Sequence, residues 1–190
     1  MSYKELVIID NEKISKKGDN FYCDNFEAKI SEDFEKVFNV TVIARKSKIN
    51  RANQINLEKI EIASNIFSFL FKILKTFKKK KTNYLIIAIN PYTFFACLFL
   101  LLFRKKIFVY LRSDGHEEYK SILGFIGPMI YGLMFKIVTF KSNIIICQKR
   151  LFGYLELGRL WALPPTVHTS LQLSHVWMRG ENQIHGRHIR

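Results

Sequence analysis

The sequence predicts an α/β fold with a doubly wound, mostly parallel sheet over residues 1–150, followed by an irregular tail over 151–190. Between residues 84 and 115, the apolar runs YLIIAI and IFVYL flank a longer run, YTFFACLFLLLF, with breaks at Asn90-Pro91 and Arg104-Lys105-Lys106. A strand–helix–strand unit of this kind connects parallel strands. Strand and helix patterns also alternate along the first 150 residues, as they do in doubly wound α/β layers.

The N-terminal half supplies two strands, a loop and a helix to this pattern. Leu6–Asp10 and Val40–Ala44 are short β-branched runs and are predicted to be buried strands. Lysine-rich Lys13–Asn20 is predicted to be a loop. Phe21–Phe38 has apolar residues at helical spacing and is predicted to be an amphipathic helix.

The second half continues the alternation of strands and helices. Alternating Ile55–Ala63 predicts a short strand that leads into a helix over Ser64–Lys81, with Ser64 as its cap. Four further elements follow: a strand at Leu85–Ile89, a helix at Tyr92–Phe103, a strand at Ile107–Leu111 and a kinked apolar helix at Ile122–Phe140. Asn143 and the IIIC run after it predict another strand.

The loops after two neighbouring strands are the first candidates for function. Asn90 and Pro91 follow one strand, and Arg112–Gly115 follows the next. Open α/β sheets bind ligands outside the carboxyl ends of their strands, so these residues are expected to share one edge.

A transmembrane interpretation of the same region is the alternative. Residues 84–103 carry no formal charge and are about as long as a bilayer-spanning helix. Residues 122–140 would form the return span of a two-span hairpin. Against this alternative, the Asn-Pro step removes a helix hydrogen bond, and both flanks of the first segment are basic, so no charge bias orients it.

The net charge of +14 predicts a partner that carries negative charge. The basic residues cluster at Lys78, Lys79, Lys80 and Lys81 and at Arg104, Lys105 and Lys106, beside aromatic helices. Cations at helix C-termini also favour the helix dipole, which is a purely structural explanation. No nucleic-acid motif accompanies the basic clusters, so an anionic membrane surface is favoured over nucleic acid.

Cysteine and histidine spacing predicts neither a metal site nor a disulfide framework. Cys23, Cys97 and Cys147 lie far apart, and Cys97 and Cys147 sit in apolar runs typical of core residues. The histidines after residue 150 have no metal-ligand spacing. The N-terminus has no signal-peptide pattern, so a cytoplasmic location is expected, with peripheral attachment to the inner face of the membrane.

Composition changes abruptly near Arg150. All lysines lie at or before Lys149, whereas both tryptophans and four of the five histidines follow it. We expect 151–190 to be an out-of-frame or fused segment or, alternatively, a genuine flexible extension.

Residues 1–150 resemble the N-terminal domain of the glycosyltransferases with two Rossmann-like domains, the GT-B type that includes glycosyltransferase family four. The resemblance rests on Leu85 to Pro91, the following helix, Arg104 to Gly115, the long apolar helix and the strand from Asn143. It implies an acceptor-side domain in which Arg112, Ser113, Gly115 and His116, together with Asn90, contact a sugar or a lipid-linked acceptor.

The resemblance also implies that the full-length family member binds a nucleotide-sugar donor in a second domain, which 40 residues cannot form. No cofactor is therefore expected in this chain, which is predicted to be truncated and inactive alone. The first strand also lacks the glycine-rich turn usual in the family. The competing function is a small, non-enzymatic membrane protein with two spans.

Asp114 is the candidate catalytic residue, as a general base toward an acceptor hydroxyl. Ser-Asp-Gly is also a common turn sequence, so Asp114 has a structural alternative. Arg112 either binds a phosphate or carboxylate, or pairs with Glu117 or Glu118. His116 is either an acceptor contact or a solvated residue at a helix start.

Overall fold

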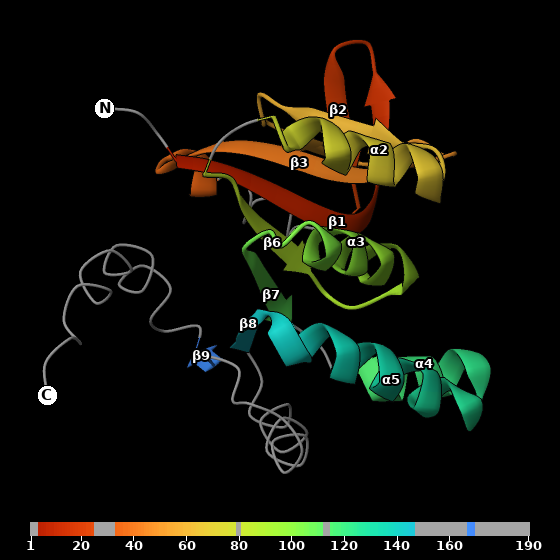
Figure 1. Cartoon of the computed structure of the whole chain (residues 1–190). Helices are drawn as coiled ribbons and strands as arrows, with labels where there is room; N and C mark the ends of the chain where they lie inside the picture. Colours follow the sequence, from red (N-terminus) through yellow and green to blue (C-terminus); the bar gives the residue numbers. More distant parts are fainter. Residues whose placement is uncertain (1–3, 25–32, 79–80, 112–114, 147–166, 170–190) are drawn as a thin grey trace, which may run out of the picture.

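The computed structural model describes residues 4–24, 33–78, 81–111, 115–146 and 167–169 and has an α/β fold (Figure 1). Within these residues, helices pack on a mixed sheet of mostly parallel strands. The strands are β1 (Lys4–Lys17), β2 (Asn20–Cys23), β3 (Phe38–Lys46), β4 (Asn53–Ile55), β5 (Ile60–Ala63), β6 (Asn83–Ile87), β7 (Ile107–Leu111), β8 (Asn143–Ile146) and β9 (Val167–Thr169). The helices are α2 (Ile66–Thr76), α3 (Pro91–Leu102), α4 (Gly115–Leu123) and α5 (Ile126–Lys141).

The parallel strands lie in the order β5-β3-β1-β6-β7-β8-β9. The chain therefore starts at the middle of the sheet, builds outward through β3 and β5, and then returns to the other side of β1 with β6. This order is compatible with a Rossmann-like fold. Strands β2 and β4 extend the far end of β1 by antiparallel pairing.

Side chains alternate between two cores along the central strands. Val7 and Ile9 of β1 belong to the core shared with α2, α3 and α5, and those helices cover one face of the sheet. Leu6 and Ile8 belong to the core on the opposite face, which Phe34 helps to cover. This alternation follows from the two-residue period of a strand and explains why β1 is apolar on both faces.

Two predictions for residues 13–38 were wrong. Lys13–Lys17 continues β1, and only Gly18 and Asp19 form a turn before β2. Ile14 and Ser15 are buried, and Gly18 adopts the positive φ of 61° that a tight turn requires. The helix predicted for 21–38 is replaced by strand at both ends, at 20–23 and from Phe38 onward, although 33–35 are helical and 25–32 lie outside the described residues.

The strand–helix–strand predictions between residues 83 and 146 are confirmed within a few residues by β6, α3, β7 and β8. Helix α2 is shorter than predicted because it ends at Thr76, before the lysines. Its cap is Asn65, whose side chain accepts a hydrogen bond from the backbone N–H of Ser68, rather than Ser64. The alternating segment 55–63 divides into the separate strands β4 and β5.

The long apolar helix predicted for 122–140 is interrupted, and α4 and α5 form a helical hairpin instead. The break falls at Gly124, which has a φ of 64°, and the next residue, Phe125, caps α5. Near the turn, Gly127 packs against the backbone carbonyl of Tyr119, where a Cβ atom would overlap it. In Figure 1 this α4–α5 hairpin extends away from the sheet.

Within the described residues, none of the helices combines the length and the apolar character needed to cross a membrane. Residues 84–103, the first span of the two-span alternative, are divided between β6 and α3. The second, 122–140, is divided between α4 and α5.

The tail was predicted to be irregular, and the described part differs from that prediction. Val167–Thr169 forms β9, which pairs in parallel with β8 at the edge of the sheet. Residues 147–166 and 170–190 lie outside the described residues. They include Cys147 and the rest of the segment predicted to be out-of-frame or fused.

Candidate functional site

The candidate site lies at the carboxyl ends of β1, β3, β6 and β7. Between β1 and β6 the order of the sheet reverses, and there Asp10 pairs in register with Ile87. In open α/β sheets this point of reversal opens a crevice outside the strand ends. The chain leaves β6 through Ala88 to Asn90 and leaves β7 toward Gly115, so the two predicted loops do begin at one edge.

Asn90 is held by a hydrogen-bonded cap at the start of α3. Its side-chain oxygen accepts from the backbone N–H of Thr93 (3.1 Å), while the Thr93 hydroxyl accepts from the backbone N–H of Asn90 (3.0 Å). The Thr93 hydroxyl also lies 2.9 Å from the carbonyl of Ala88, to which it donates. Within the described residues the Nδ2 group of Asn90 has no partner, so it is the group that can donate to a ligand.

Ala88 has a left-handed backbone, with φ of 58°. This conformation is unfavourable for a residue with a Cβ atom, and such residues are concentrated at functional sites. The backbone N–H of Ala88 donates to the carbonyl of Tyr110 in β7 (3.0 Å), and its own carbonyl accepts from Thr93. These two bonds stabilise the strained turn that leads from β6 into α3.

Gly115 and His116 begin α4 at the same edge. Gly115 is buried against the ring of Tyr131, and a Cβ atom there would overlap that ring. The ring of His116 is half-buried and packs edge-on against Tyr131, with 4.7 Å between ring centroids. Both residues therefore seat α4 on α5. Arg112, Ser113 and Asp114 lie outside the described residues.

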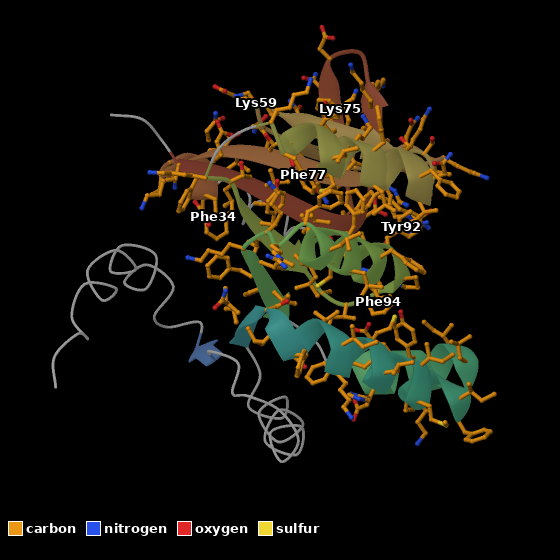
Figure 2. All side chains as sticks on the ribbon, in the orientation of Figure 1. Phe34, Lys59, Lys75, Phe77, Tyr92 and Phe94 are labelled. Carbon is orange, nitrogen blue, oxygen red and sulfur yellow. The ribbon has the colours of Figure 1, made fainter. Side chains whose placement is uncertain are left out.

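A second group of polar residues at this edge was missed by the sequence analysis. Nη1 of Arg45, near the end of β3, donates to Oδ1 of Asn11 in β1 (3.0 Å). The guanidinium also lies over the ring of Tyr92 in the first turn of α3, 4.3 Å from its centroid. Tyr92 packs edge-on against Phe69 of α2 (5.6 Å) and faces α2 in Figure 2. Applying the strand-end rule to Val40–Ala44 would have identified Arg45.

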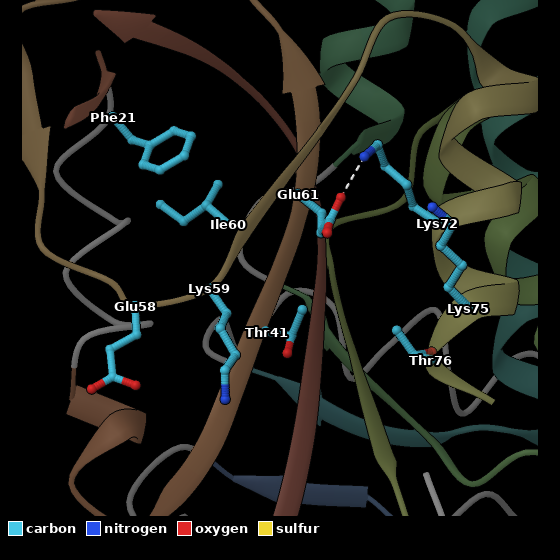
Figure 3. A pocket seen from close by; sticks show the side chains of 9 residues that line it. All are labelled: Phe21, Thr41, Glu58, Lys59, Ile60, Glu61, Lys72, Lys75 and Thr76. Carbon is cyan, nitrogen blue, oxygen red and sulfur yellow. Dashed lines mark hydrogen bonds and ion pairs between the residues drawn. The ribbon is translucent and has the colours of Figure 1, made fainter. Parts of the chain in front are cut away.

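A hollow of about 390 Å³ lies at the outer edge of the sheet, between β5 and the end of α2 (Figure 3). Its charged lining consists of two glutamates and three lysines, and Lys72 forms an ion pair with Glu61. The Nζ of Lys59 donates to Oδ1 of Asn39 (2.8 Å). Because Lys75 and Thr76 belong to the last turn of α2, the hollow faces away from the carboxyl ends of the strands.

The predicted membrane-surface lysines and arginine follow the ends of α2 and α3, except that Lys79 and Lys80 lie outside the described residues. Lys105 lies over the ring of Phe77 (4.4 Å), and Lys106 lies over Phe108 (5.2 Å). Lys81 and Arg104 both have positive φ values, of 61° and 52°. These cations thus form the basic border at the end of the helix layer opposite the candidate site.

The helix layer exposes many large apolar side chains. Helices α2, α3 and α5 each carry a stripe of outward-facing apolar residues at helical spacing, in addition to the residues that they bury. The exposed stripes are Phe67, Phe71 and Leu74 on α2; Phe95, Leu98 and Leu102 on α3; and Ile126, Met129, Ile130 and Leu133 on α5. Phe125, at the turn of the α4–α5 hairpin, is 80% exposed.

Cys97 is a core residue, as predicted. Burial raises the pKa of its thiol to about 11, and the contact between its Sγ and the Ser142 hydroxyl (3.8 Å) lowers the pKa only in part. A neutral, buried thiol is a poor nucleophile and a poor metal ligand. Among the residues that the structure describes, no group of three or more histidine, cysteine or acidic side chains could hold a metal ion.

Comparisons with models of protein families, with curated proteins and with solved structures gave no match.

Proposed function

We propose that residues 1–150 form the Rossmann-like, acceptor-side domain of a sugar-nucleotide-dependent glycosyltransferase. The observation that supports this proposal is the meeting of Asn90, Gly115 and Arg45 at one edge, on both sides of the point where the strand order reverses. That edge is where open α/β sheets bind small molecules. The nucleotide-sugar donor belongs, in this proposal, to the second domain of the full-length family member.

The residues divide between binding and catalysis. Asp114 accepts the proton of the acceptor hydroxyl as its oxygen bonds to the anomeric carbon of the donor sugar and the nucleoside diphosphate leaves. Arg112 binds a phosphate or carboxylate of the acceptor, and Asn90, Ser113, Gly115 and His116 contact the acceptor. Gly115 supports this proposal, because it begins α4 at the carboxyl edge after β7.

The acceptor is a sugar or a lipid-linked sugar, and the domain works at the inner face of an anionic membrane. The support for this location is the exposed apolar surface of α2, α3 and the α4–α5 hairpin, together with the basic border formed by Lys105 and its neighbours. Apolar residues beside cations are typical of surfaces that bind to bilayers without crossing them.

Acceptor binding can be tested by NMR on the isotopically labelled chain. We expect a prenyl-diphosphate-linked monosaccharide to shift the backbone amide signals of Asn90, Gly115 and His116. The amides of Lys59 and Lys75, in the hollow, serve as internal controls and should not move. Shifts confined to the hollow, or no shifts at millimolar ligand, would contradict an acceptor site at this edge.

Carbonate extraction separates the proposal from the two-span alternative. A peripheral domain is released from membranes at alkaline pH, whereas a two-span hairpin is retained. Retention of the chain would therefore favour the non-enzymatic membrane protein.

The catalytic role of Asp114 is tested separately. With any donor and acceptor pair for which transfer is measured, Asp114→Asn should lower kcat by roughly 10²- to 10⁴-fold, the usual contribution of a general base. A loss of only a few-fold with an unchanged circular dichroism spectrum would make Asp114 a turn residue.

A further inference from the structure

Arg45 is a half-buried cation whose position is fixed by neutral groups. Its Nη1 donates to Asn11 Oδ1 (3.0 Å), and its plane lies over Tyr92 (4.3 Å). Tyr92 is fixed in turn by its edge-on contact with Phe69. The guanidinium is therefore held in one orientation at the carboxyl edge, between the starts of α2 and α3.

No carboxylate among the described residues pairs with Arg45. Other partly buried cations in this protein do have such partners: Arg51 pairs with Asp24, and Lys72 pairs with Glu61. A partly buried guanidinium without a counter-ion is unfavourable unless a ligand supplies the negative charge. Arg45 therefore differs from Arg51 and Lys72, each of which has a carboxylate partner within the chain.

A second positive charge lies beside Arg45 on the neighbouring strand β1. Lys13 of β1 pairs in register with Arg45, so the two residues share one face of the sheet, whereas Lys46 pairs with Ile14 and lies on the opposite face. The acidic residues nearest in the chain are Asp10 and Glu12, and Asp10 Oδ1 already accepts from the backbone N–H of Glu12 (3.1 Å). Asp10 lies on the opposite face from Asn11, because successive residues of a strand alternate.

We propose that Arg45, positioned by Asn11 and Tyr92 and assisted by Lys13, binds a phosphate group of the molecule that occupies the carboxyl edge. A guanidinium presents N–H donors in a planar fork that matches phosphate oxygens. Stacking on Tyr92 leaves the N–H groups that do not donate to Asn11 available for phosphate. The two cations on this face, Arg45 and Lys13, suit the charge of a phosphate, close to −2, better than that of a carboxylate.

This site goes beyond the proposed function because it assigns a ligand class to residues outside the predicted loops. It rests on that function only for the source of the phosphate. The source is either the diphosphate of a prenyl-linked acceptor or the diphosphate of a nucleotide, and both present the same chemistry to Arg45.

The first test is calorimetric titration of the full chain with inorganic pyrophosphate. Arg45→Gln should weaken binding roughly 10- to 100-fold, since hydrogen bonds to charged groups are the strong ones. Lys105→Gln is the matched control: it removes one positive charge that also lies over an aromatic ring, but at the opposite end of the helix layer. It should change the affinity less than two-fold.

A second variant, Asn11→Asp, tests the proposal even if Arg45→Gln does not fold. Asn11→Asp places a carboxylate against the guanidinium, which should preserve the local contact while competing with pyrophosphate, so binding should again weaken. Equal losses in Arg45→Gln and Lys105→Gln, or undisturbed binding in Asn11→Asp, would overturn the proposal, as would no binding by the original chain.

A prenyl diphosphate and a nucleoside diphosphate are then titrated separately. Tighter binding of the prenyl compound than of pyrophosphate, dependent on Arg45, assigns the site to the acceptor. Tighter binding of the nucleotide, dependent on Arg45, keeps the phosphate site but contradicts an acceptor-side assignment. Failure of the phosphate site and failure of the acceptor-side assignment therefore give different results.

Discussion

At the scale of single residues, the corner between β7 and α4 depends on the absence of a side chain at Gly115. We expect Gly115→Ala to destabilise the protein by about 1–3 kcal/mol, because the new methyl group would overlap the ring of buried Tyr131. Urea unfolding monitored by circular dichroism measures this change.

Gly132→Ala in α5 is the matched control for that substitution. The nearest atom to its added Cβ would be Nε2 of His116 at 3.7 Å, an ordinary contact, and alanine favours a helix over glycine by up to about 1 kcal/mol. Its stability should stay the same or rise. Equal destabilisation by both substitutions would show that the close packing of Gly115 is not the cause.

Cys97 should make stability fall with rising pH. Burial raises the pKa of its thiol to about 11 in the folded chain, whereas an exposed thiol titrates near about 8.5. The folded state thus holds the proton more tightly. The free energy of unfolding is therefore unaffected below about pH 8.5 and falls by roughly 3 kcal/mol as the pH rises to about 11.

Cys97→Ala removes that titration, and unfolding at a series of pH values compares the two proteins. We expect the difference in stability between them to shrink as the pH rises from 8 to 11. A constant difference across this range would mean that the thiol ionises alike in the folded and unfolded states. Tyr84, whose pKa burial also raises, is present in both proteins and cancels.

At the scale of elements, the two asparagine caps provide an internal comparison. Asn90 and Thr93 form reciprocal hydrogen bonds at the start of α3, whereas the Asn65 side chain accepts one from Ser68 at the exposed start of α2. We expect Asn90→Ala to destabilise by about 1–2 kcal/mol and Asn65→Ala by about 0.5–1 kcal/mol. The urea midpoints of the two variants show which substitution destabilises the protein more. Equal losses of stability would contradict this expectation.

The elements predicted most accurately are those whose hydrophobic pattern in the sequence matches the burial of their residues in the fold. Ile107–Leu111 is strand in both the prediction and the structure, because its apolar run is short and ends at Arg112. The strand over Lys13–Lys17 was not predicted because it depends on pairing with β3 and β2, contacts that composition does not reveal. The prediction of one kinked helix over Ile122–Phe140 was only partly right, because an apolar run has the same pattern whether a helix continues or folds back.

The candidate site could be predicted only where one strand is followed by a recognisable breaker. Asn90-Pro91 marked the end of β6, and its position at the carboxyl edge follows from the parallel order of the sheet. The strand-end rule points to the position of Arg45, but no breaker follows it. Its contacts with Asn11 and Tyr92 could not be predicted, because these residues are distant in sequence and meet only after β1, β3 and α3 assemble.

At the scale of the whole molecule, the helix layer is apolar on both its inner and its outer side. Helix α3 buries Ala96, Cys97 and Leu100 against the sheet and still exposes Phe95, Leu98 and Leu102. A helix that is apolar all round is normally covered on every side. Within α2, α3 and α5 every charged residue is a lysine, which favours an anionic bilayer as the cover.

We therefore expect the chain to sediment with vesicles that contain anionic lipid and to be released as salt rises, because charges more than about 10 Å apart are screened at about 0.1 M. Replacing both Phe125 and Met129 by serine should lower binding at least roughly ten-fold at any salt concentration, since burying one such side chain contributes about 1.5–3 kcal/mol. Lys105→Gln combined with Lys106→Gln should instead weaken binding mainly at low salt.

The control is Ile49→Ser, which removes a side chain that is also exposed (64%) but follows β3, outside the helix layer. If Ile49→Ser weakens binding as much as the hairpin substitutions, or if neutral vesicles bind equally well at all salt concentrations, the helix layer is not the surface that recognises anionic lipid.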